Sequence, residues 1–212
     1  TTMALDKDTG QATVTFDGSS AQTVSGNIEG AADTEGLIIV NNDVNFTGEI
    51  GTGTTDGVGN VRIASGKTLT LTSGTDADGL YVTGKLDADS SDTRGGTVTL
   101  VASNAAAEDT AGTTQISQID GTTTLTAVNI TGGTGGLSDA ALSAGEVGGA
   151  SSATFVGASD ITTVTLSGGT GGAGLADNAS DTDGGVGGAT TGTFTAALTA
   201  TNVNDNAGTG GA

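Results

Sequence analysis

Apolar and polar residues alternate along this chain in short bursts. In each burst two apolar residues enclose one polar residue, as Val14 and Phe16 enclose Thr15. The same arrangement occurs at Val44/Phe46, Val61/Ile63, Leu69/Leu71, Leu80/Val82, Val98/Leu100 and Val164/Leu166. A period of two predicts strands that bury one face, and the Gly, Asp, Asn and Ser residues between the bursts are typical of turns. Many short strands are therefore expected.

Helix signals are weak by comparison. Residues 103–109 (SNAAAED) and 137–145 (LSDAALSAG) contain several alanines, but both segments are short and flanked by polar or glycine residues. Isolated helices of that length are marginal in water. We predict an all-β fold of about a dozen strands, spaced roughly 8 to 18 residues apart, which suits a sandwich and a solenoid equally.

Internal repeats separate these two architectures. Three short motifs recur in the second half of the chain at offsets of 36 or 39 positions. They are GGTGG at 132–136 and 168–172, VGGA at 147–150 and 186–189, and TF at 154–155 and 193–194. A period of this size is typical of stacked repeats. The expected fold is a parallel β-solenoid (β-helix) of stacked irregular repeats, with β-sandwich modules as the alternative.

The repeats also suggest how the chain is organised. Residues 1–123 are expected to form a β-solenoid segment. Residues 124–212 are expected to form glycine-rich repeats of 36–39 residues that continue the same β structure. The final GTGGA follows a repeat's glycine cluster, at the point where the next strand is due. This suggests a fragment of a longer chain, or an open end that a neighbouring copy completes.

The GGTGG clusters resemble phosphate-binding loops only superficially. No Lys-Ser or Lys-Thr follows either copy, no helix is predicted behind it, and residues 95–212 contain no cation. The structural interpretation is that the glycines supply turns with positive φ or allow close backbone packing. The clusters would then mark where a strand ends and the chain turns into its next layer.

The composition limits the classes of partner that the chain is expected to bind. The 212 residues carry a net charge of −19, and the cations are confined to Lys7, Arg62, Lys67, Lys85 and Arg94. Nucleic acids and anionic membranes require Lys or Arg contacts with phosphates, so neither is an expected partner. No run of about 18 apolar residues occurs, so no membrane-spanning helix is expected. High acidity is also typical of disorder, but the β-branched bursts favour a folded chain.

The first hundred residues resemble a known class of surface protein. The stretches that carry the resemblance are TVTFDGSSAQTVSGNI at 13–28, GLIIVNNDVNFTGEIG at 36–51 and VRIASGKTLTLTSG at 61–74. They are similar to the passenger domains of bacterial autotransporters and to related repeat-rich surface antigens and adhesins. The resemblance implies a secreted, right-handed parallel β-helix that acts as a stalk or an adhesive surface.

Closely spaced carboxylates are the candidate metal ligands. Calcium takes six to eight oxygen ligands, and loops with carboxylates at alternate positions supply them efficiently. The best candidates are Asp76 and Asp78 in one loop and Asp87, Asp89 and Asp92 in another. Neither loop has the twelve-residue pattern with a distal Glu, so solvated loops are the alternative interpretation.

Catalysis is not expected. The chain has no His or Cys that could serve nucleophilic or metal-assisted routes. Thr-x-Thr motifs offer another function, because ordered threonines on a flat solenoid face bind ice in other proteins. They occur at 13–15, 68–70, 70–72, 97–99, 163–165 and 193–195. Their irregular spacing argues against one motif per coil in register, which favours outward threonines of high strand propensity.

The sequence thus predicts a non-enzymatic structural protein of an extracellular or virion surface. It would serve as a stalk, an adhesin or a self-assembling filament or surface-layer component. Its expected partners are copies of itself and cell-surface glycans. The alternatives are a viral or phage fibre or coat component, and a calcium- or carbohydrate-binding module.

Overall fold

The protein is an all-β molecule of parallel strands. The computed structural model describes residues 2–6, 11–32, 35–51, 56–73, 78–88, 92–105, 111–138, 144–174 and 184–211, except for the side chains of Ser73 and Asp78. These residues form seventeen strands and no helix, which confirms the all-β prediction. Every pairing described between strands is parallel. Antiparallel sandwich modules are therefore wrong for the described part of the chain.

The strands stack in three parallel ladders. The first ladder contains β1 (Thr2–Leu5), β4 (Asn27–Gly30), the single residue Ile50, β9 (Asp78–Val82), β12 (Thr114–Ile119), β14 (Ser151–Phe155) and β16 (Thr190–Phe194). The second contains β2 (Thr13–Phe16), β5 (Leu37–Val40), β7 (Asn60–Ile63), β10 (Leu86–Asp87) and the first parts of three longer strands. These longer strands are β13 (Thr123–Thr131), β15 (Ser159–Ser167) and β17 (Leu198–Asn206). The third contains β3 (Gln22–Val24), β6 (Val44–Phe46), β8 (Thr68–Ser73), β11 (Gly95–Ala102) and the remainders of β13, β15 and β17.

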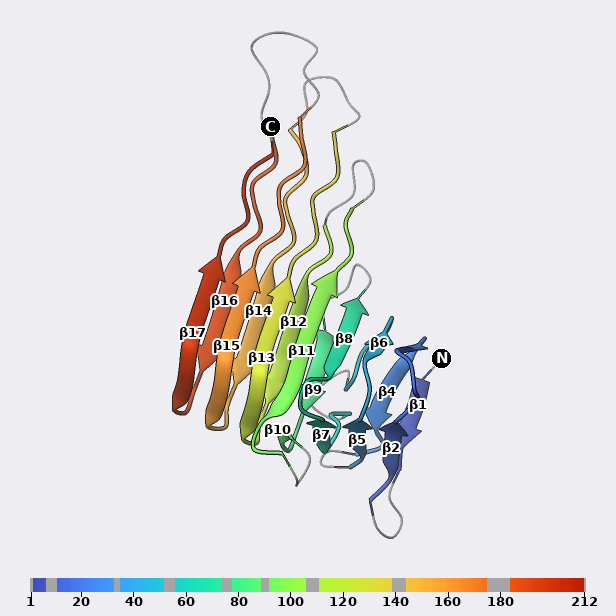
Figure 1. Ribbon diagram of the computed structural model, residues 1–212. Helices are drawn as coiled ribbons and strands as arrows, with labels where there is room; N and C mark the ends of the chain where they lie inside the picture. The colour runs from blue at the N-terminus through green and yellow to red at the C-terminus, as the bar shows by residue number, and fades with distance from the viewer. Residues whose placement is uncertain are drawn as a thin grey trace.

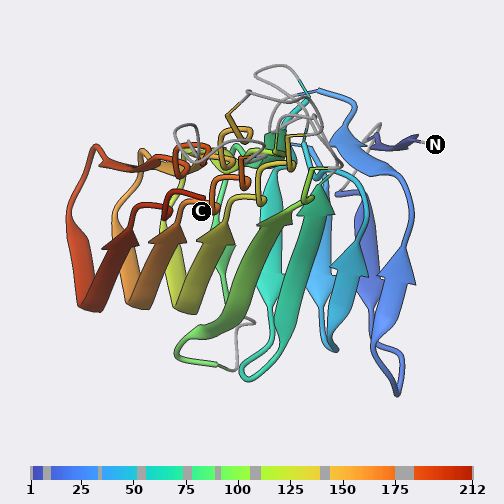
Figure 2. The same ribbon diagram turned by 90° about the horizontal axis from the view of Figure 1, so that it is seen from above.

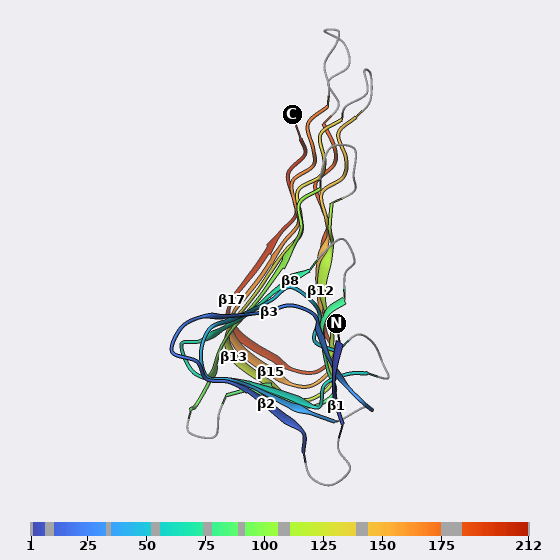
Figure 3. The same ribbon diagram turned by 90° about the vertical axis from the view of Figure 1, so that its right-hand side faces the viewer.

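The chain passes over the first, second and third ladders in turn, and each such passage is here called a coil. Seven coils follow one another from the N-terminal end to the C-terminal end (Figures 1 and 2). Viewed along the stack, the three ladders outline a triangle (Figure 3). No helix in the described ranges is long and apolar enough to cross a bilayer.

The interior of the triangle is filled by rows of like side chains. One row of the third ladder contains Phe46, Leu71, Leu100, Ile130 and Leu166, all buried. Each buried side chain of this size stabilises the fold by about 1.5–3 kcal/mol. Phe155 stacks on Phe194 of the next coil with ring centroids 5.1 Å apart. Because the chain has few aromatic residues, its core consists mainly of aliphatic side chains stacked in regular rows.

The coils differ in length mainly because of one corner. Between the third and first ladders the connections are residues 25–26, 47–49, 74–77, 103–113, 132–150 and 168–189, in order along the chain. The connection thus grows from two residues to twenty-two. The later connections leave the triangle side by side as an extended projection (Figures 1 and 3). We call its described segments, 132–138, 144–150, 168–174, 184–189 and 208–211, the glycine arm.

Candidate functional site

The predicted calcium ligands fall partly outside the described residues. Asp76 and Asp89 lie there entirely, and only the backbone of Asp78 is described, at the start of β9. The carboxylate of Asp87 lies 3.9 Å from the Arg62 guanidinium, and the carboxylate of Asp92 accepts a hydrogen bond from the Ser65 N–H at 3.0 Å. Over the described ranges no three Asp, Glu, His or Cys side chains form a group that could hold a metal. A calcium site in these loops stays a prediction.

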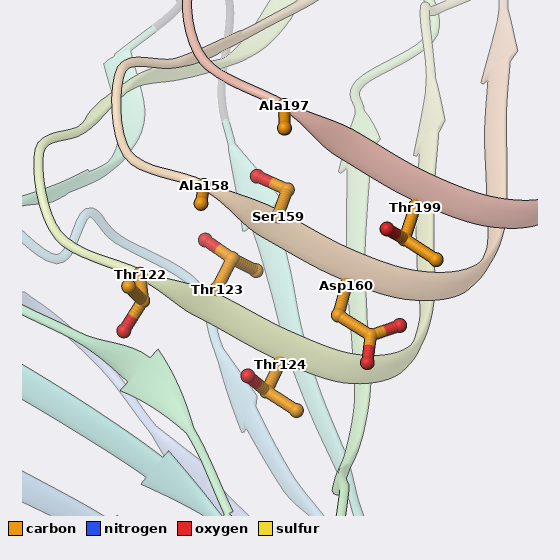
Figure 4. Close-up of a pocket in the computed structure, with 8 residues that line it drawn as sticks. All are labelled: Thr122, Thr123, Thr124, Ala158, Ser159, Asp160, Ala197 and Thr199. Carbon is orange, nitrogen blue, oxygen red and sulfur yellow. The ribbon is translucent and has the colours of Figure 1, made fainter.

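A shallow pocket of about 220 Å³ lies on the second ladder (Figure 4). Its walls come from the starts of β13, β15 and β17 and the turns before them. They are formed by Thr122, Thr123, Thr124, Ala158, Ser159, Asp160, Ala197 and Thr199. Hydroxyl and methyl groups dominate this lining, and Asp160 supplies its one carboxylate. The pocket therefore offers hydrogen bonds to a small polar molecule but no pair of carboxylates for acid–base chemistry.

Arg94 holds Asp160 in an interaction that sequence analysis missed. Its guanidinium donates to the Asp160 carboxylate and to the Asp160 carbonyl, each at 2.7 Å, and to the Leu125 carbonyl at 3.1 Å. Because Arg94 precedes β11, these bonds connect the fourth coil with the fifth and sixth. One feature of the sequence could have drawn attention to Arg94: it is the last cation of the chain, and 118 residues without a cation follow it. The role of Arg94 is to hold neighbouring coils together.

The GGTGG clusters are not turns but extended segments of the glycine arm. From residue 132 to residue 137, pairs of buried glycines alternate with one exposed residue, first Thr134 and then Leu137. A period of three, with hydrogen bonds only to neighbouring segments, is typical of the polyproline II conformation. The bonds also advance in steps of three: the N–H groups of Gly132 and Gly135 donate to the carbonyls of Ser167 and Thr170 at 2.9 and 2.8 Å. The clusters follow directly on β13 and β15 and begin the connections to the next coil, as expected, but they do so as extended segments rather than as turns.

A line of glycines crosses the whole arm. The line begins at Gly112, in the segment before the arm, and from Gly133 on each N–H donates to the carbonyl of the preceding glycine in the line, at 2.8 to 3.0 Å. The order of the line is Gly112, Gly133, Gly149, Gly169, Gly188 and Gly208. Segments that leave the triangle alternate with segments that return to it, so the line zigzags between two layers. Backbone hydrogen bonds therefore continue from the ladders into the arm.

Close backbone approach explains why these positions are glycine. A Cβ at Gly149 would lie 1.8 Å from the carbonyl oxygen of Gly112, and one at Gly169 would lie 1.7 Å from that of Gly133. No side chain fits such a gap. The described glycines with positive φ are Gly26, Gly36, Gly51 and Gly66, all in the first three coils. Of the two explanations offered for the clusters, close packing is confirmed and positive φ is wrong.

The third ladder presents a second regular surface, here called the threonine face. Its central row of outward residues is Thr23, Asn45, Thr70, Thr99, Asn129, Thr165 and Asn204. One flanking row is Thr68, Thr97, Ala127, Thr163 and Asn202, and the other is Thr72, Val101, Thr131, Ser167 and Asn206. The Thr-x-Thr motifs at 68–70, 97–99 and 163–165 are thus in register. The connections absorb the differences in coil length, but the motif does not occur once per coil. The fifth and seventh coils have Ala127 and Asn129, and Asn202 and Asn204, at these positions. The motifs at 13–15 and 193–195 fall on the second and first ladders.

No protein-family model matches this chain, and the searches of curated proteins and of solved structures gave no match either. The resemblance to autotransporter passenger domains therefore stays a prediction.

Proposed function

We propose that the chain is a parallel β-solenoid that serves as a non-enzymatic structural protein of an extracellular surface, as a stalk, an adhesin or a component of a filament or surface layer. The observation that carries this proposal is the continuity of three parallel ladders from the first coil to the seventh. Hydrogen bonds between parallel strands run along the stack, so a load on the axis is shared among all three ladders. The acidic composition suits a soluble, exposed surface.

The glycine arm supports the same role. Its backbone bonds make it a continuation of the ladders that projects sideways from the triangle (Figure 3). The side chains of Leu137, Val147 and Val186 are 50% to 70% exposed on the arm. Val147 and Val186 lie on neighbouring segments, which the Gly148 N–H joins by donating to the Val186 carbonyl at 2.9 Å, and adjoining exposed apolar side chains favour an interaction surface. The arm is therefore the surface on which we place the proposed self-association.

The seventh coil departs from the pattern of one interior row. In the interior row of Leu100, Ile130 and Leu166, the seventh coil has Asp205. Its carboxylate accepts a hydrogen bond from the Thr190 hydroxyl of the same coil. A carboxylate at an interior position disfavours the stacking of a further apolar row on this coil.

Immunogold labelling of the producing culture tests the proposed location. Antibodies raised against the purified chain should label intact, unpermeabilised cells at their outer surface. Labelling of virus-sized particles instead would support a fibre or coat component of the same fold. Labelling that requires permeabilised cells would overturn the proposed surface role.

A further inference from the structure

The threonine face is the most regular surface in the described part of the molecule. Its central row contains one outward Thr or Asn in each of the seven coils, without interruption. Successive coils are about 4.8 Å apart, and outward residues on one parallel strand are about 6.6 Å apart. The result is a two-dimensional grid of hydroxyl and amide groups. A grid of this kind suits a partner that is itself periodic.

The threonine face is also uncharged. None of its seventeen residues is Asp, Glu, Lys or Arg, although 14% of the chain is charged. The second ladder differs, since Arg62, Asp87 and Asp160 lie at outward positions there. The first ladder carries Glu29 at an outward position. Asp43, directly before β6, borders the face, where its carboxylate accepts a hydrogen bond from the Thr68 N–H at 2.9 Å, but the strand positions of the face itself carry no charge.

The side chains of the threonine face are held in place before any partner arrives. Threonine is β-branched, so its first side-chain torsion is stiff. Hydrogen bonds join neighbouring coils: the Thr72 hydroxyl donates to the Asn45 amide oxygen at 3.1 Å, and the Asn204 amide donates to the Thr165 hydroxyl at 3.4 Å. A stiff surface loses little entropy on binding, because its side chains are already ordered.

The chemistry of the face excludes several periodic partners. Ionic minerals attract charged side chains, and the face has none. Crystalline polysaccharides are bound through aromatic platforms, and Tyr81, the one tyrosine, is buried in the first ladder. A second protein favours Tyr, Trp, Met and Arg at an interface core, and none of these occurs among the seventeen residues. The remaining partner is a neutral lattice of hydrogen-bond donors and acceptors.

We propose that the threonine face binds ice. Oxygen atoms in the prism planes of ice repeat in two directions at spacings close to those of the grid. Hydroxyl and amide groups anchor water molecules in lattice positions, and the threonine methyl groups fill the space between them. This inference goes beyond the proposed surface role and does not depend on it.

Ice-affinity partitioning with matched variants tests the proposal. The purified 212-residue chain should enter slowly growing ice and inhibit ice recrystallisation at micromolar concentration. Thr99→Lys and Thr165→Lys place a bulky charge in the central row and should weaken both activities about tenfold or more, as for a loss of about 1.4 kcal/mol in adsorption. The control is Thr154→Lys, at an outward, partly exposed position of β14 on the first ladder. It should behave as the unmodified chain does.

Circular dichroism melting of each variant shows whether it is folded, so that unfolding is not mistaken for lost binding. Exclusion of the unmodified chain from ice, to the same extent as serum albumin, would overturn the proposal. An equal loss in Thr154→Lys would also overturn it. Two other results would overturn it if the chain does not bind ice. One is capture of the chain on crystalline chitin or cellulose that Thr99→Lys abolishes. The other is a dimer in sedimentation that Thr99→Lys abolishes.

Discussion

The first three coils and the last three coils are closed by different means. Paired residues are 22 to 25 positions apart in the first three, as at Gln22 and Val44, and 36 to 39 positions apart in the last three, as at Ser151 and Thr190. Short coils turn their corners with glycines of positive φ. In the long coils, the connection between the third and first ladders forms the glycine arm. The second and third ladders stay in register through both regions, because each is fixed by its own hydrogen bonds and interior rows, and the first ladder shifts its register only within β12.

Glycine has a different purpose in each region. In the short coils it gives the backbone a conformation that other residues avoid. In the long coils it provides room for a neighbouring carbonyl. The two roles respond differently to substitution, which allows the comparison to be tested.

The largest effect is expected from Gly149→Ala in the arm. The new methyl group would overlap the carbonyl oxygen of Gly112. Because this oxygen belongs to the backbone of a packed segment, the two segments have to move apart. We expect the free energy of unfolding of the arm to fall by about 3 kcal/mol or more. Hydrogen exchange should show lost protection at the N–H groups of Gly169 and Gly188.

Gly210→Ala is the matched control in the arm, because the nearest atom to its Cβ is 3.5 Å away. It should leave exchange at Gly169 unchanged. Equal protection in Gly149→Ala and the unmodified chain would show that the segments of the arm are not packed as described.

A smaller effect is expected from Gly66→Ala in the third coil. Gly66 has a φ of +73° and no atom within 4 Å of a Cβ, so the cost is conformational only, about 1 kcal/mol. Gly66→Asn should cost less, since asparagine tolerates this conformation. Chemical denaturation measures both changes. A larger loss for Asn than for Ala would contradict the assigned role of Gly66.

The smallest effect is expected from Arg94→Gln, at the boundary between the two regions. The Arg94 and Asp160 side chains are 31% and 49% exposed, so solvent screens their ion pair and the loss in stability should be about 1 kcal/mol. Arg62→Gln is the control in the short coils. Its longer contact with Asp87, at 3.9 Å, should contribute less than about 0.5 kcal/mol. The reverse order of the two losses would contradict the role given to Arg94.

Part of the fold was predictable from local pattern. Alternation at Val44/Phe46, Leu69/Leu71 and Val98/Leu100 marked strands that do lie on one ladder, because period-two burial is a property of each strand alone. The TF motifs at 154–155 and 193–194 lie directly against each other in neighbouring coils. Of the candidate calcium ligands, only Asp87 and Asp92 have described side chains, so the calcium site stays a prediction.

The sequence by itself determined the strands, the absence of charge from the Thr-x-Thr motifs and the places of the glycine clusters at 132–136 and 168–172. Only the tertiary structure decided what those features do. Register between coils depends on hydrogen bonds between distant residues, so connections of two or twenty-two residues give the same alignment, and irregular motifs become continuous rows. The same long-range bonds place one backbone against another in the arm, where glycine is required by a neighbour rather than by its own φ.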